Sequence, residues 1–236
     1  MPRVLLALLI MFALPVLAQP VPAKVTQAQL DGAVESASAL PEDDPTREAL
    51  LKLYSETRSA LESFSSFSVS LEEFSRAQTS AREQAITIKD EVAARQAAPG
   101  EVDSDAIREF SLTETEQKIK LNKSELDALK SRRTDIRARI DAMPGRIKTV
   151  RERLTELGTV RAELESQMSL MQQDPEAGGE DQARLWRAQA EQAAFAAEKA
   201  SLDAELLSEP MRMELLKAQL DGLSLDITGL EKKLQA

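Results

Sequence analysis

An apolar side chain recurs every three or four residues along most of this 236-residue chain, and this spacing most constrains its fold. Residues three and four apart share one face of an α-helix, whereas a strand changes face at every residue. The pattern therefore predicts long amphipathic helices that each bury a seam against neighbouring helices, as in a coiled coil. The first seam covers about six heptads: Leu50, Leu53, Thr57, Ala60, Phe64, Phe67, Leu71, Phe74, Gln78, Ala81, Ala85, Ile88 and Val92.

Two later stretches keep the same spacing. One seam runs from Ile119 to Met171 and passes through Pro144 without a change of frame. Because proline removes a helix hydrogen bond and crowds the preceding turn, we expect either a kink or a tight helix-to-helix turn there. The other stretch begins at Trp186 with an alanine-rich seam, which permits close approach of a neighbouring helix. It continues to Leu234 with leucine and isoleucine after a one-residue shift of frame.

Capping signals indicate where the helices start. Thr26 is suited to cap a short helix, and Ser111 and Glu114 have the spacing of a capping box. Ser208 followed by Pro210 predicts a new helix at the shift of frame. The predicted long helices lie at about 46–98, 104–143, 144–172, 180–208 and 210–235.

The predicted fold is all-α: an elongated antiparallel coiled-coil or helical-hairpin bundle over residues 46–236. A proline-rich segment with one short helix, at 19–45, comes before this domain. Only 8 residues are glycine and 3% are aromatic, a composition that favours long helices over a compact aromatic core.

The first 18 residues have the layout of a secretory signal peptide. Arg3 supplies the positive start, Val4–Leu14 is an apolar run, and Val16 and Ala18 suit cleavage before Gln19. The alternative is a retained membrane anchor, although the run is shorter than the roughly 20 residues of a spanning helix. We expect an exported chain in a bacterial periplasm, with a parent protein in the inner membrane. It contains no cysteine, so disulfides do not stabilise it.

The formal net charge of −10 disfavours nucleic acid and anionic lipid as partners. A dense basic cluster between Lys130 and Arg153 has two interpretations. It either contacts an anionic polymer or phospholipid surface, or it pairs with acidic helices elsewhere in the chain. The expected partners are proteins: envelope proteins or further copies of the chain.

The sequence offers no set of catalytic side chains. It contains no histidine and no cysteine, so the commonest general base, the thiol nucleophile and most zinc or iron ligand sets are absent. The carboxylates at 42–44 and 72–73 lack the spacing of a calcium loop and are interpreted as solvated surface. We expect no enzymatic activity, no metal, no cofactor and no small-molecule substrate. Trp186 is expected to close one end of the bundle.

Several short motifs, in order along the chain, resemble a known family. Phe110-Ser111-Leu112 is similar to the start of that family's first long helix, Met143-Pro144-Gly145-Arg146 to its Pro-x-Arg turn, and 215–221 to its Leu-rich Gln-x-Asp helix. These segments resemble the periplasmic helical region, also labelled a porin domain, of large MscS-type mechanosensitive channels. Gly145 and Leu220 depart from the pattern, since an acidic residue and an arginine are common at those positions.

The resemblance implies the N-terminal periplasmic helical domain of a mechanosensitive ion channel. Such a domain would tune gating or contact the envelope without conducting ions, and it could form a homo-oligomer through the parent channel. A free-standing periplasmic coiled-coil adaptor or scaffold is the alternative. The candidate structural and interaction residues are Pro144, Arg146, Trp186, Leu216, Gln219 and Asp221.

Overall fold

The structure is a computed structural model that describes residues 25–97, 111–171 and 179–235. The predicted signal peptide lies outside the described residues and remains a prediction. Four helices form the described part: α1 (Gln27–Ser38), α2 (Pro45–Ala97), α4 (Leu112–Met171) and α5 (Gly179–Gln235). No strand occurs among these residues, so the all-α prediction is confirmed.

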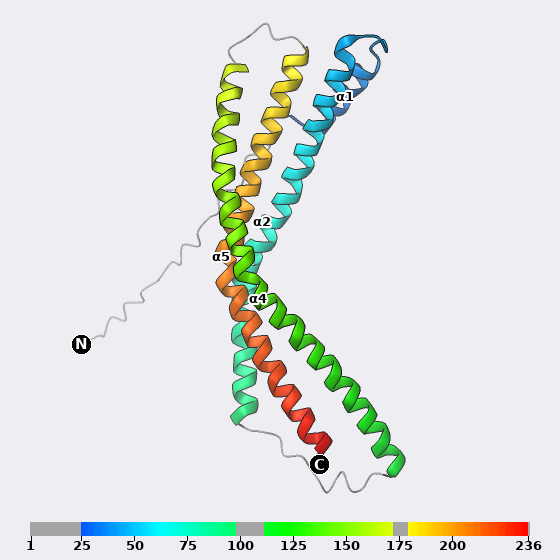
Figure 1. Ribbon diagram of the computed structural model, residues 1–236, viewed down its shortest axis with the longest axis vertical. Helices are drawn as coiled ribbons and strands as arrows, with labels where there is room; N and C mark the ends of the chain where they lie inside the picture. The colour runs from blue at the N-terminus through cyan, green and yellow to red at the C-terminus, as the bar shows by residue number, and fades with distance from the viewer. Residues whose placement is uncertain (1–24, 98–110, 172–178, 236) are drawn as a thin grey trace, which may run out of the picture.

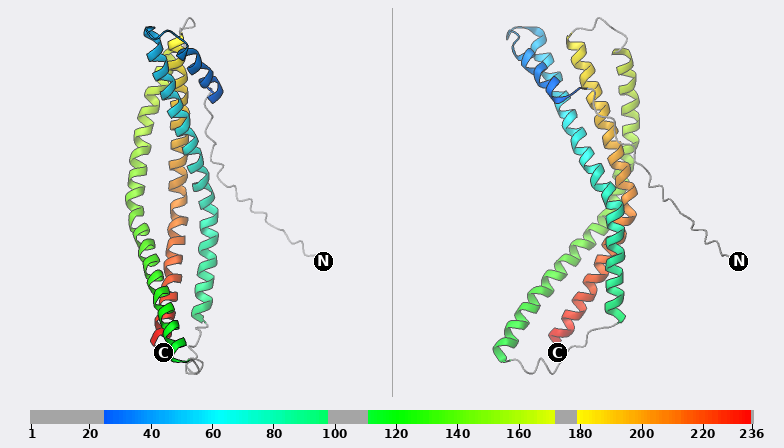
Figure 2. Two further views of the ribbon diagram at one scale, coloured as in Figure 1. Left: turned by 90° about the vertical axis from the view of Figure 1, so that its right-hand side faces the viewer. Right: turned by 180° about the vertical axis from the view of Figure 1, so that it is seen from behind.

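The three long helices lie side by side with α5 in the centre (Figures 1 and 2). α5 packs against both α2 and α4, whereas α2 and α4 share at most a marginal contact with each other. α2 and α5 run in the same direction, and α4 runs antiparallel to both. The prediction of an elongated helical-hairpin bundle is therefore confirmed, with α4 and α5 as the antiparallel hairpin.

The layer of three helices is twisted along its length. In Figure 1 it is seen face-on at both ends, and the order of the helices at the top is reversed at the bottom. After a 90° turn, the middle of the layer faces the viewer instead (Figure 2, left). Each long helix has 53 to 60 residues, so each is about 80 to 90 Å long.

Local capping explains where the helices begin. Thr26 and Gln29 form a capping box at α1, and Ser111 and Glu114 form the predicted one at α4. The carboxylate of Asp44 accepts bonds from the amide and hydroxyl of Thr46, which holds its pKa below the ordinary value. Ser111 caps the first turn of α4, which begins at Leu112; the part of the predicted helix between residues 104 and 110 lies outside the described residues.

The predicted seams match the burial of α2 and α4. In α4, Ile136, Val150, Leu157, Leu164 and Met168 are all buried, and all belong to the predicted seam. α5 differs because it is covered from two sides. Its alanine-rich seam faces α2, where Ala190 packs near Ala60, and its leucine seam faces α4, where Leu216 and Leu223 pack against Ile136. Both halves of α5 contact both neighbours, so the shift of frame marks only where the counted seam passes from the face toward α2 to the face toward α4.

Neither internal proline ends a helix, which corrects the predicted boundaries at 143/144 and 208/210. Pro144 lies inside α4, so a tight helix-to-helix turn does not occur there. Pro210 lies inside α5, where the hydroxyl of Ser208 donates to the carbonyl oxygen of Glu205 at 3.0 Å. Packing against neighbouring helices keeps both segments helical despite the hydrogen bond that each proline removes.

The described helices contain no stretch that is both long enough and apolar enough to cross a membrane. At the end where α1 joins, Leu30 and Tyr54 form a small core with Trp186 at its border. The rings of Tyr54 and Trp186 lie 6.2 Å apart. This core joins α1 to α2 and, through Ala183, to α5.

Candidate interaction site on the central helix

α5 carries a stripe of polar side chains that faces the groove between α2 and α4. Its members recur every seven residues and therefore lie on one side of the helix. We call this row the polar stripe: Glu191, Glu198, Glu205, Arg212, Gln219 and Asp226. Glu198 and Glu205 are buried, which is rare for a carboxylate unless a partner neutralises it.

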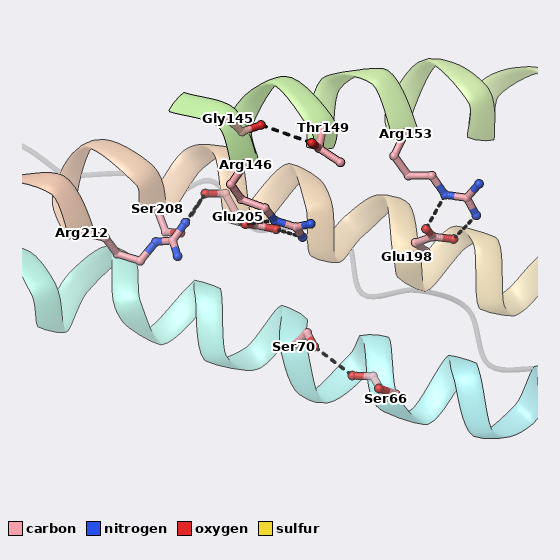
Figure 3. Close-up of polar contacts among 10 residues, drawn as sticks. All are labelled: Ser66, Ser70, Gly145, Arg146, Thr149, Arg153, Glu198, Glu205, Ser208 and Arg212. Carbon is pink, nitrogen blue, oxygen red and sulfur yellow. Dashed lines mark hydrogen bonds and ion pairs between the residues drawn. The ribbon is translucent and has the colours of Figure 1, made fainter. Parts of the chain in front are cut away.

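Two arginines of α4 supply that partner (Figure 3). Arg146 donates from Nε and Nη2 to the two carboxylate oxygens of Glu205, at 2.8 and 2.7 Å. Arg153 makes the same forked contact with Glu198, at 2.7 and 3.0 Å. These bonds raise the pKa of both arginines above the ordinary value. Planar two-bond contacts fix direction as well as distance, so they hold α4 and α5 in one register.

Contacts from α2 complete the stripe. Arg95 of α2 pairs with Asp226, and the guanidinium of Arg212 lies 4.9 Å from the centre of the Phe74 ring. Arg212 also donates to the carbonyl oxygen of Glu205 at 3.3 Å. The polar stripe therefore joins α5 to both neighbours, and it does so with interactions that depend on helix register.

The structure brings three of the six predicted residues together. Arg146, Leu216 and Gln219 line one cleft, and Pro144 lies two residues before Arg146 on α4. Trp186 lies in the distant core near α1, and Asp221 lies on the exposed side of α5. Their functional roles stay predictions, since position alone does not test them.

Sequence reasoning missed the buried glutamates and Arg212. A signal was present, because Arg139, Arg146 and Arg153 of α4 are spaced by seven residues, as are the members of the polar stripe on α5. Two charged rows with equal spacing on antiparallel helices can pair at successive positions. Arg146 with Glu205 and Arg153 with Glu198 are such successive pairs, one seven-residue step apart on each helix.

The basic cluster of α4 is only partly neutralised. Four of its nine members form ion pairs in the structure: Lys130, Arg146, Lys148 and Arg153. The other five make none with any residue that the structure describes: Arg132, Arg133, Arg137, Arg139 and Arg151. The middle of α4 therefore keeps positive charge in an acidic chain. Within the described ranges, no three acidic side chains are grouped so that they could hold a metal ion.

Comparison with known proteins gives one match. A family model described as the mechanosensitive ion channel porin domain matches residues 33–236. No curated protein and no solved structure matches the chain. The matched range includes all three long helices and the polar stripe.

Proposed function

Because this chain belongs to the family of the mechanosensitive ion channel porin domain, we propose that it adjusts the gating of such a channel and does not form the conducting pore. It would have no enzymatic role. The observation that supports this proposal is the length of the three helices and the ion pairs that connect them. Forked Arg–Glu contacts connect α4 to α5, and further ion pairs connect α5 to α2.

A helical domain outside the pore can change gating only if it stabilises the open and closed states of the channel by different amounts. Contacts at one end of the domain supply that difference if they form better in one state than in the other. We infer that such contacts would be made with envelope proteins or neighbouring subunits. The leader-like residues 1–18 support a periplasmic location for these contacts.

Patch recordings test the proposal directly. An MscS-type channel that carries this domain is compared with the same channel lacking residues 19–236, and both the tension at half-opening and the single-channel conductance are measured. We expect the tension to shift while the conductance is unchanged. A matched pair of variants refines the comparison: Leu157→Ala, in the buried α4–α5 seam, should shift the tension, and exposed Leu170→Ala should not.

Two outcomes would count against the proposal. Loss of conductance with an unchanged tension would place this domain in the conduction path. No change in either quantity would favour the alternative of a periplasmic scaffold.

A further inference from the structure

A cleft of about 460 Å³ opens between the three long helices near the middle of α4. Small apolar side chains form much of its wall, among them Ala77 and Ala81 of α2 and Ala142 of α4. Three guanidinium groups also line it: Arg139 and Arg146 from α4 and Arg212 from α5. We call this space the arginine cleft. Its volume falls within the range of small-molecule sites, roughly 300 to 1,000 Å³.

The positive charge in the arginine cleft exceeds the negative charge. Glu205 is the one acidic residue among the described residues that line it, and both of its carboxylate oxygens already accept bonds from Arg146. Arg139 forms no ion pair with any described residue. Arg212 has only uncharged direct contacts, namely a backbone carbonyl and the Phe74 ring. Arg139 and Arg212 therefore have no carboxylate bound to their guanidinium groups.

Arg212 is held in a position that is unfavourable for a cation. Its Nε is buried and has no hydrogen-bond acceptor. Burial lowers its pKa; the carboxylates of Glu205 and Glu209 oppose this effect, and the charges of Arg146 and Arg139 add to it. A buried cation without a bound counter-ion costs free energy, so an anion in the cleft would supply the counter-charge that Arg212 lacks.

We propose that the arginine cleft binds a phosphate group, with Arg139 and Arg212 as its two direct cationic contacts. Guanidinium groups match the oxygens of phosphate with paired bonds, which an ammonium group cannot do. Gln84 of α2 and Gln219 of α5 line the same cleft and supply neutral donors. The space exceeds that of a bare phosphate and is partly apolar, so the ligand would carry a further neutral or apolar part.

The proposed ligand would contact α4 and α5 at once, with α2 forming part of the wall. Binding would then stabilise the packed arrangement of the three helices, since a ligand stabilises the form that it binds. This inference is independent of the proposed gating role, because it rests on the charges and volume of the arginine cleft alone. The phosphate source is either a soluble phosphate compound or the headgroup of an anionic phospholipid.

Two measurements on the full chain test the proposal. Titration calorimetry with inorganic phosphate, against sodium chloride at equal ionic strength, tests the soluble source. Flotation with phosphatidylglycerol vesicles, against phosphatidylcholine vesicles, tests the headgroup. We expect binding in at least one assay, weakened about tenfold or more by Arg212→Gln and by Arg139→Gln. The control is Arg151→Gln, which changes an exposed residue of α4 outside the cleft and should leave binding unchanged.

Arg139→Gln keeps the test decisive if Arg212→Gln disturbs packing, since Arg139 is exposed and lies on another helix. Equal binding by Arg139→Gln and the unaltered protein would overturn the proposal. So would phosphate binding no stronger than chloride together with no preference for phosphatidylglycerol. A loss of equal size in Arg151→Gln would also overturn it, because it would indicate general attraction to the basic helix.

Discussion

Replacing Arg146 with methionine tests whether the forked contact with Glu205 holds α4 to α5. Methionine keeps much of the apolar stem but removes the guanidinium, which leaves a buried carboxylate without its counter-charge. The Glu205 side chain is 4% exposed, whereas that of Arg146 is 53% exposed. Removing one partner of a fully buried pair costs about 3 to 5 kcal/mol, and an exposed pair contributes about 1 kcal/mol or less.

Because one partner is buried and the other half-exposed, we expect Arg146→Met to lower the free energy of unfolding by about 2 kcal/mol. For a chain of this size that corresponds to about 4 to 8 °C in thermal midpoint. Urea unfolding followed by circular dichroism measures the change. The control is Arg151→Met, an exposed substitution on the same helix, which should stay within about 0.5 kcal/mol.

A double variant separates the ion pair from the packing of the arginine stem. Arg146→Met combined with Glu205→Gln removes both charges, so it should be less destabilised than the sum of the two single variants. The reasoning is refuted if Arg146→Met is no more destabilising than Arg151→Met. It is also refuted if the two single effects simply add.

Three further substitutions extend the test to other parts of the bundle. Leu157 is fully buried, so Leu157→Ala should cost about 2 to 5 kcal/mol in urea unfolding, whereas Leu170→Ala, 67% exposed, should cost little. Burial raises the pKa of Glu191; nearby Glu56 adds to this effect and Arg187 opposes it. Because the pKa is higher in the folded state than in the unfolded state, ionisation of Glu191 disfavours the folded state as the pH rises. Glu191→Gln should therefore raise the thermal midpoint at pH 7, with the gain closing toward about pH 4; a gain that is independent of pH would contradict this. Pro144→Ala should also raise the thermal midpoint, because alanine restores an amide donor within α4; a lower midpoint would show that packing requires the proline.

The seams could be predicted from the sequence because burial on a helix follows a local period. Leu53, Ala81 and Val150 lie where the three-and-four spacing places them, and all are buried. The capping box of Ser111 and Glu114 is equally local and was also predicted correctly. In each case the signal lies within a few residues of the position that it describes.

The remaining features depend on which helices meet and in which register. Arg146 and Glu205 are 59 residues apart, and their pairing requires the α4–α5 register. Pro210 was expected to start a new helix, but packing on two sides of α5 keeps that helix continuous. The two-sided burial of α5 was missed for the same reason, because counting one seam assumes a single partner helix.

The twist of the three-helix layer has a mechanical consequence. A flat ribbon bends easily in one direction only, but in a twisted ribbon that direction rotates along the length, so no single direction is compliant throughout. Pulling the ends of a twisted ribbon apart also tends to unwind it. An axial force on this domain would therefore turn one end relative to the other, and the arginine–glutamate contacts along α5 would resist that rotation by fixing the helices against sliding.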